Sequence, residues 1–402
     1  MSERSCSALE PAPGLRLHGG SHVLLLALAV AAVSRLGLWL AGVLAFLLLP
    51  SGAARQPGNL FWHQPVTPAL EVFARWDAEW YLLVAERGYD VGDELRALGL
   101  RHASTDAAGF LPLYPLLIRC LAPLTGAVGA GVLVSHLAFF LAVVLLFRFT
   151  AAEVGEQGGD EAGLVAVAAL AAFPTSLFLS AVYAESLFLA LSLGALWCAR
   201  QRRMAVAGVL GGLAAVTRPF GVFLVLPLAM EWWRHHRNDR ARVSGLAALL
   251  LVPAGFAGYL VYCWRLFGDP LVYFHQKTGW RGGLGGPWTA FLRWWETGPA
   301  VHGTHGSSVE LVFAVAAMAG LVVMARRLRA SLVVYSVVCV ASALGSSLWS
   351  FGRLVLVVFP FFVLVGVLWS RGVRWPALVL LGIGGPLGGV FMAMFANWWW
   401  VG

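Results

Sequence analysis

The amino-acid sequence predicts an all-α polytopic membrane protein, a bundle of about eleven transmembrane helices with two long extracytoplasmic loops. Of its 402 residues, 59% are hydrophobic and only 12% are charged, and the mean hydropathy is +0.78. These values lie outside the usual range of soluble globular domains. The apolar residues form long runs, and the arginines between the runs are unevenly distributed. We therefore expect residues 1–402 to form a single integral membrane domain.

Each long apolar run is expected to form one helix across the bilayer, because about 20 apolar residues span its hydrocarbon core. Several central runs are shorter, so we expect broken or tilted helices that lean on their neighbours. The first run is too long for the core of a signal peptide and is expected to remain as an anchor. The runs are residues 22–50, 126–150, 163–181, 185–200, 204–217, 219–233, 243–266, 308–325, 331–349, 354–369 and 375–396.

The arginine distribution predicts the orientation of these helices. With the N-terminus in the cytoplasm, fifteen arginines fall into cytoplasmic segments, whereas the short outer connections hold only Arg218 and Arg353. Positive residues collect in short cytoplasmic loops, so this assignment follows the positive-inside rule. The two long loops, 51–109 and 265–307, are then extracytoplasmic.

Several other classes of function have little support in the sequence. The net charge of +8 comes from scattered basic residues, of which Lys277 is the only lysine, and not from a basic stripe typical of nucleic-acid binding. The five cysteines have no CxxC spacing, and there is no nucleotide fingerprint. The sequence "HGTH", 302–305, is a weak metal signal. We expect no cofactor and no nucleic-acid partner, with a divalent metal left open.

The segment "FARWDAEWYLLVAERGY", residues 73–89, places a carboxylate among apolar residues. Interpreted as one helix over 68–88, it has an apolar stripe that includes Asp77 and an opposite charged face, on which Arg75 and Glu79 are spaced as an i,i+4 pair. This pattern is typical of a helix at the membrane surface. Asp77 is then either an interfacial anchor or cap, or a functional carboxylate at the membrane boundary.

Other polar residues recur at the predicted outer ends of helices, and each has a structural alternative. Glu185 follows Tyr183 at an outer turn, where an acid also stabilises a helix N-terminus. Arg218 and Arg353 stand alone at helix breaks, where an arginine also extends toward the interface. We expect the following polar and aromatic residues to bind substrate: Arg75, Trp76, Glu79, Tyr183, Glu185, Ser186, Arg218, Asp269, Gln276 and Arg353.

A series of short motifs follows one another along the chain: "RWDAEWY" with "RGY", "FLPLYPLL", "YAESLFLALSLG", "TRPFG", "FGDP", and "FGR" followed by "FPFF". The combination and order of these motifs resemble those of the PIG-V family of membrane mannosyltransferases, part of the GT-C superfamily. The resemblance extends over about residues 30–395. The glycine, alanine and arginine content and the compact loops look more like a bacterial member.

This resemblance implies a transferase that moves mannose from a polyprenyl-phosphate donor to a lipid- or glycan-linked acceptor on the outer side of the membrane. It also implies that an acid of the first outer loop is the catalytic base, which here matches Asp77. A lipid-linked sugar has its phosphate at the interface, so the base must lie at that depth. A leaving lipid phosphate calls for arginine.

Two alternatives remain open at the level of sequence. The same fold could transfer another polyprenyl-phosphate sugar, such as glucose or a pentose, because nothing in the sequence distinguishes one hydroxyl orientation from another. A transporter or flippase of lipid-linked saccharides is the second alternative. It predicts inverted repeats and polar residues at the bilayer midplane, whereas the polar motifs here collect at one face.

Overall fold

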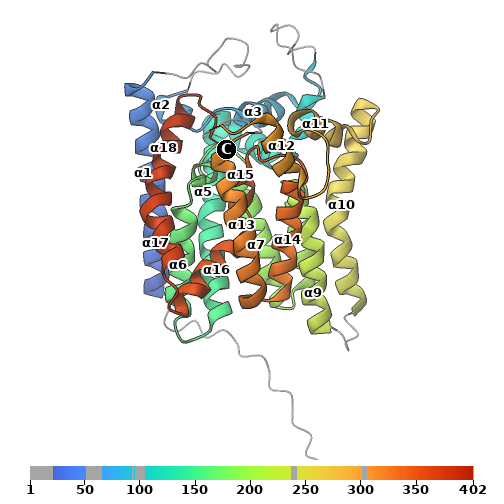
Figure 1. Cartoon of the computed structure of the whole chain (residues 1–402). Coiled ribbons are helices and arrows are strands. Elements are labelled where there is room, and N and C mark those ends of the chain that lie inside the picture. The colour runs from blue at the N-terminus through green and yellow to red at the C-terminus, as the bar shows by residue number, and fades with distance from the viewer. Residues whose placement is uncertain are drawn as a thin grey trace, which may run out of the picture.

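The computed structural model describes residues 21–50, 66–92, 95, 105–236, 242–300 and 306–401. Their regular elements are helices, which confirms the predicted all-α class (Figure 1). Those of the first half are α1 (Ser21–Leu48), α2 (Pro68–Glu71), α3 (Asp77–Arg87), η1 (Asp106–Gly109), α5 (Leu113–Val154), α6 (Gly159–Ala171), η2 (Ser176–Leu179), α7 (Glu185–Arg200) and α8 (Met204–Ala215). Those of the second half are η3 (Pro219–Leu224), α9 (Val225–His236), α10 (Arg242–Phe267), α11 (Val272–Arg281), α12 (Thr289–Thr297), α13 (Ser308–Arg327), α14 (Ala330–Leu344), α15 (Phe351–Leu356), α16 (Pro360–Ser370), α17 (Trp375–Val379), η4 (Leu380–Gly384) and α18 (Gly385–Ala396).

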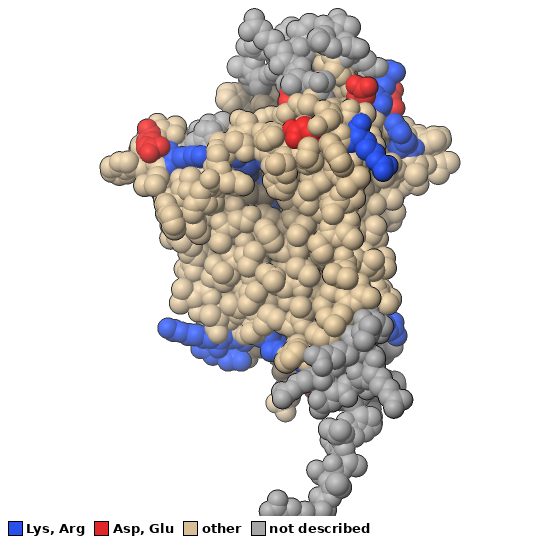
Figure 2. Space-filling view, turned by 90° about the vertical axis from the view of Figure 1, so that its right-hand side faces the viewer, with Lys and Arg blue, Asp and Glu red and all other residues tan. Residues whose placement is uncertain are grey.

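Five of the described helical segments are long and apolar enough to cross a membrane. They are α1, α5, the Gly245–Phe267 part of α10, α13, and the segment Trp375–Ala396 formed by α17, η4 and α18. Three shorter apolar helices, α8, α14 and α16, stand among them. In Figure 2 the visible face has an uncharged belt between two charged ends. The chain is a multi-pass membrane protein, while the count of about eleven spans remains a prediction.

The short central helices are enclosed by protein. Helix α7 has 16 residues, fewer than a straight span prefers. It packs against α5 and α8, and most of its side chains are buried, from Glu185 to Ala199. Short or broken helices are tolerated in a membrane where neighbouring protein surrounds them.

Glycines let α8 and α10 approach closely. A Cβ atom on Gly212 would lie 2.7 Å from the carbonyl oxygen of Leu251, and one on Gly255 would lie 2.6 Å from that of Gly212. Real side chains do not fit at such distances. Small residues at helix interfaces allow the backbone contact that holds helices together in lipid, where the hydrophobic effect contributes little.

The two ends of the bundle are chemically different. At one end the carboxylate of Glu153 forms ion pairs with Arg200 at 2.9 Å and Arg329 at 3.3 Å, which joins the ends of α5 and α7 to the start of α14. At the other end α2, α3, α11 and α12 lie over the upright helices (Figure 1). The connections η2–α7, α8–η3 and α14–α15 reach this second end.

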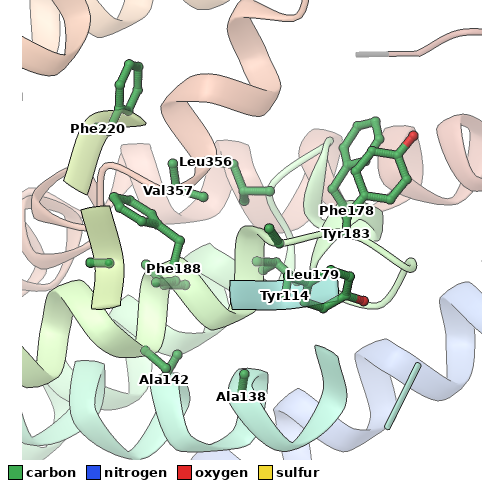
Figure 3. Packing of buried hydrophobic residues seen from close by; sticks show 14 of the residues in the cluster. Tyr114, Ala138, Ala142, Phe178, Leu179, Tyr183, Phe188, Phe220, Leu356 and Val357 are labelled. Atoms are coloured by element: carbon green, nitrogen blue, oxygen red, sulfur yellow. The ribbon is translucent and has the colours of Figure 1, made fainter. Parts of the chain in front are cut away.

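Buried aromatic and aliphatic side chains pack closely in the core, among them those of Tyr114, Phe178 and Tyr183 (Figure 3). The rings of Phe178 and Tyr183 are 5.0 Å apart between centroids, and both side chains are fully buried. The hydroxyl of Tyr114 donates a hydrogen bond to the carbonyl of Gly131 at 2.9 Å. Close packing of this kind holds the buried side chains in defined positions.

Candidate active site

Asp77 is the first residue of α3, and the helix predicted over 68–88 is interrupted just before it. Helix α2 ends at Glu71, and Trp76 has φ 58° and ψ −121°. This is an uncommon conformation for a residue with a side chain. The prediction of one continuous surface helix was therefore wrong. The break places the Asp77 carboxylate at the N-terminus of α3, where the helix dipole favours negative charge.

The loop before α7 holds this break in place. The Tyr183 hydroxyl donates to the carbonyl of Arg75 at 3.0 Å and accepts from the backbone N–H of Asp77 at 3.2 Å. The N–H of Val182 donates to the carbonyl of Phe73 at 3.0 Å. These bonds replace helical hydrogen bonds that the break removes. Tyr183 thus fixes the position of Asp77 through its two hydrogen bonds to the backbone.

Arg75 and Glu79, predicted on a charged outer face, are both buried. The Arg75 guanidinium points away from Asp77: it donates to the carbonyl of Ala396 at 3.0 Å and pairs with Glu71 at 3.1 Å. The helix break turns Arg75 back toward α2, so that it pairs with Glu71, four residues before it; its predicted i,i+4 pair with Glu79 stays a prediction. Arg75 joins the first loop to the C-terminal segment.

Trp76 also packs against the C-terminal segment. Its side chain does not line the cavity that is described below. Its ring centroid lies 5.9 Å from that of Trp398 and 5.4 Å from that of Trp400. The guanidinium of Arg75 lies over the Trp398 ring at 5.0 Å. The C-terminal tryptophans therefore support the backbone that carries Asp77.

Asp77 belongs to a cluster of two carboxylates and two arginines. Arg353 Nη1 donates to Asp77 Oδ2 at 2.6 Å, and Arg353 Nε donates to Glu185 Oε1 at 2.5 Å. Arg218 Nη1 donates to the same Glu185 oxygen. The Glu185 side chain is fully buried, whereas 33% of the Asp77 side chain is exposed. Two negative and two positive charges balance, and only the outermost carboxylate has room for a ligand.

A cavity of about 360 Å³ opens beside this cluster. Asp77, Arg218 and Arg353 line it, as do two cations of α11, Lys277 and Arg281. Much of the remaining wall is aromatic: Tyr81, Phe110, Phe220, Phe223, Phe256, Tyr273 and Phe274. One carboxylate, several cations and apolar rings thus meet in one space at the end of the bundle.

The other predicted site residues lie outside this wall. The Ser186 hydroxyl donates to the carbonyl of Leu179 at 2.6 Å, within the buried support of α7. Asp269 is exposed and accepts from the Leu271 N–H at 2.8 Å; this bond holds the pKa of its carboxyl below the usual value. It stabilises the turn before α11. Gln276 donates to the Thr105 hydroxyl at 2.5 Å and so joins α11 to the first loop.

Lys277 and Arg281 were not among the substrate-binding residues predicted from the sequence, although they line the cavity. A signal was present: Tyr273, Lys277 and Arg281 repeat at intervals of four residues and share one face of a helix. Lys277 is also the only lysine of the chain.

The described residues contain no group of three His, Cys, Asp or Glu side chains that could hold a metal ion. The weak metal signal at 302–305 lies outside the described residues. The cavity wall offers one carboxylate, Asp77, among several cations. This donor set favours an anionic ligand over a divalent cation.

Residues 53–236 match the model of the mannosyltransferase (PIG-V) family. The match confirms the resemblance drawn from the motifs. It covers just under half of the chain and includes Asp77, Glu185 and Arg218, whereas α11 and α15 lie beyond it.

Among solved structures, the chain is similar to ArnT from Cupriavidus metallidurans bound to undecaprenyl phosphate, with 15% identity and a TM-score of 0.48. That similarity covers 94% of this chain and 76% of ArnT. It is also similar to the oligosaccharyltransferase of Archaeoglobus fulgidus tethered to an acceptor peptide, with 12% identity and a TM-score of 0.44 over 93% of this chain and 55% of that one. No curated protein sequence matches the chain.

Proposed function

We propose that this protein is a glycosyltransferase that moves mannose from a polyprenyl-phosphate donor to a hydroxyl of a lipid- or glycan-linked acceptor. The family match supports a membrane glycosyltransferase. The observation that carries the proposal is the cavity, in which one partly exposed carboxylate lies beside cations and aromatic rings. The sugar and the acceptor are part of the proposal, because no residue of the wall distinguishes one hexose from another.

In the proposed mechanism Asp77 is the general base. Arg353 holds its Oδ2, while Oδ1 has no partner among the described residues. An acceptor hydroxyl that binds at Oδ1 gives up its proton as its oxygen attacks the anomeric carbon. The bond from that carbon to the phosphate oxygen breaks, and the phosphate leaves with the electron pair. Removing the hydroxyl proton during attack makes a weak nucleophile effective.

A single displacement with inversion fits the carboxylates of this site. A retaining mechanism needs a second carboxyl group about 5 Å from the first, on the reacting face of the sugar. Glu185 is the nearest acid in the cluster, but it is buried behind Arg353 and does not line the cavity. With one exposed carboxylate in the cavity, we propose a single displacement in which Asp77 acts as the base.

The cations of the wall suit the phosphate of a lipid-linked donor, and the aromatic rings suit its prenyl chain. Guanidinium and ammonium groups bind phosphate and stabilise the negative charge that develops on it. Arg218 and Arg353 are proposed to contribute to this field, because both line the cavity. The aromatic wall formed by η3, α10 and α11 gives the adjoining prenyl chain an apolar surface.

The proposal is tested by incubating purified protein in lipid nanodiscs with labelled polyprenyl-phosphate-mannose and candidate acceptor lipids. We expect label to move from the donor to one acceptor with inverted anomeric configuration. Label transferred only from a glucose or pentose donor would replace mannose in the proposal. Absence of transfer from every donor, together with movement of intact donor across vesicle membranes, would indicate a flippase.

We further propose that the cavity faces the extracytoplasmic side, with the N-terminus in the cytoplasm. In a variant whose native cysteines are replaced by serine, Glu296→Cys on α12 is expected to react with an impermeant maleimide in intact cells. Both Glu296 and Arg327 are exposed, and Arg327 lies in the last turn of α13, at the opposite end. Arg327→Cys is expected to react only after permeabilisation. The reverse labelling pattern would invert the proposed orientation.

A further inference from the structure

The positive charge of the cavity is not evenly balanced. Arg353 and Arg218 form ion pairs with Asp77 and Glu185, so their charges are matched within the cluster. Arg281 donates to the Ser346 hydroxyl and to the Ser347 carbonyl, each at 3.0 Å. The electrostatic field of the buried Glu310 carboxylate also acts on it. Lys277 is the remaining cation of the wall.

Lys277 has aromatic faces around it and no hydrogen-bond partner among the described residues. Its Nζ lies 5.0 Å from the ring centroid of Trp280, 5.5 Å from that of Phe110 and 5.8 Å from that of Tyr273. A Cβ atom on Gly109 would lie 3.7 Å from Nζ, so the first loop also lies against the amine. The three N–H donors of an ammonium here are available to a ligand in the cavity.

Burial among these rings lowers the pKa of Lys277 to about 7, with the negative charge of Asp77 opposing the shift and the nearby arginines adding to it. The charged or titratable groups of the surrounding wall are Asp77 and Tyr81 of α3, Arg218 before η3, Arg353 of α15, and Tyr273 and Arg281 of α11 itself. The carboxylate of the cavity wall, Asp77, is already held by Arg353. An amine in this position changes its charge state easily.

We propose that Lys277 binds the phosphate group of the donor and takes up a proton as the donor binds. This inference rests on the proposed function for the identity of the donor. The phosphodiester carries one negative charge at neutral pH, and it supplies the ionic partner that Lys277 lacks among the described residues. Without protonation the phosphate would depend on the arginines of the wall, of which Arg218 and Arg353 are already paired with carboxylates. Burying a charge without a matching partner is costly in a partly desolvated site.

Transfer then strengthens the same contact. As the bond from the anomeric carbon to the phosphate oxygen breaks, the phosphate keeps the electron pair and gains a second negative charge, while the acceptor proton goes to Asp77. A protonated Lys277 stabilises the developing charge without any further rearrangement. Lys277 thereby acts on the leaving group, and Asp77 acts on the nucleophile.

The sign of the pH dependence follows from proton uptake. Below pH 7 Lys277 is already charged in the empty cavity, so donor binding takes up no proton there. Above pH 7 the empty site is neutral, and the Kd for the donor should rise by about tenfold per pH unit until the pKa of the complex is reached. The donor phosphodiester does not titrate in this range, so the dependence of the donor Kd on pH must come from a group of the protein.

We test this by measuring the binding of polyprenyl-phosphate-mannose, without acceptor, to the full chain in nanodiscs between pH 6 and pH 9. The wild-type Kd is expected to rise with pH, whereas Lys277→Arg is expected to give a flat profile, because guanidinium stays protonated. Lys277→Met should bind weakly at pH 6 and also show no slope. A flat wild-type profile, or a Lys277→Arg profile that rises like wild type, overturns the assignment.

Because Lys277 is the only lysine, its protonation can also be observed directly. Reductive methylation with ¹³C-formaldehyde gives one side-chain NMR signal beside that of the N-terminal amine, and the side-chain signal disappears in Lys277→Arg. We expect its titration midpoint near pH 7 in the empty protein and a higher midpoint with the donor. A midpoint unchanged by the donor contradicts the proposal.

These measurements separate the two proposals. A protein that binds the donor with this pH dependence but transfers no sugar would contradict the proposed function and leave the phosphate site standing. A protein that transfers mannose with binding independent of pH would contradict the role of Lys277 alone.

Discussion

Replacing Asp77 with asparagine is expected to lower turnover by about 10²- to 10⁴-fold, the usual contribution of a general base. Asparagine keeps the size of the side chain and an oxygen that can accept from Arg353, but it has no basic oxygen for the acceptor proton. Arg353 remains paired with Glu185 at 2.5 Å, so the cluster retains a counter-charge and the protein should fold. The loss should appear in kcat, measured with saturating donor and acceptor, while donor Kd changes little.

The matched control for this variant is Asp90→Asn. Asp90 is an exposed carboxylate shortly after the end of α3, on the same side of the protein. It is expected to keep wild-type turnover. Glu79→Gln is unsuitable as a control because Glu79 is buried. Near-normal turnover of Asp77→Asn would leave Asp77 as a structural partner of Arg353 and remove it from the mechanism.

Asp77 could be singled out from the sequence because its chemistry conflicts with its surroundings. A carboxylate in an apolar stripe has a desolvation cost, so its presence needs a reason. The exact geometry behind that signal could not be predicted. No glycine or proline marks the break at Trp76, because the break depends on Tyr183 and Val182, which lie more than a hundred positions along the chain. Local sequence propensities cannot predict a break that depends on contacts between distant segments.

The lone arginines were informative for a similar reason. Arg218 and Arg353 stand where no orientation signal requires a positive charge, and both line the cavity. Their shared partner, Glu185, also has a simple local explanation as a helix-capping acid. Only the fold shows that it lies between the two arginines. Charge pairing between distant segments is set by tertiary structure.

The second long loop shows the opposite case. Asp269 occurs in a polar turn and was predicted to bind substrate, yet it accepts the hydrogen bond that begins α11. Lys277 and Arg281, on the helix that follows, reach the cavity. A turn residue and a cavity-lining residue can look alike in sequence, because the difference depends on which face of α11 packs against η1. The role of Asp269 in substrate binding stays a prediction.

Removing the charge of Glu185 is expected to have the largest effect on stability. Glu185→Gln keeps the volume and an oxygen that can accept from Arg218 and Arg353, so the substitution isolates the charge. Glu185 is the fully buried partner of both arginines, so its neutralisation leaves Arg218 without a carboxylate, whereas Arg353 keeps Asp77. Breaking a buried ion pair in this way costs about 3–5 kcal/mol, because the remaining charge is desolvated without compensation. We expect a clearly lower melting temperature in detergent.

The double variant Glu185→Gln with Arg218→Met distinguishes this explanation from simple loss of contacts. It restores charge balance, since Arg353 and Asp77 remain as one pair at 2.6 Å, and methionine fills much of the space of the arginine stem. Buried pairs replaced as a whole by apolar groups are often neutral in stability. The double variant should therefore melt above Glu185→Gln alone, although it removes more contacts. If it melts below the single variant, then hydrogen bonding and packing, and not the balance of buried charge, hold this part of the site together.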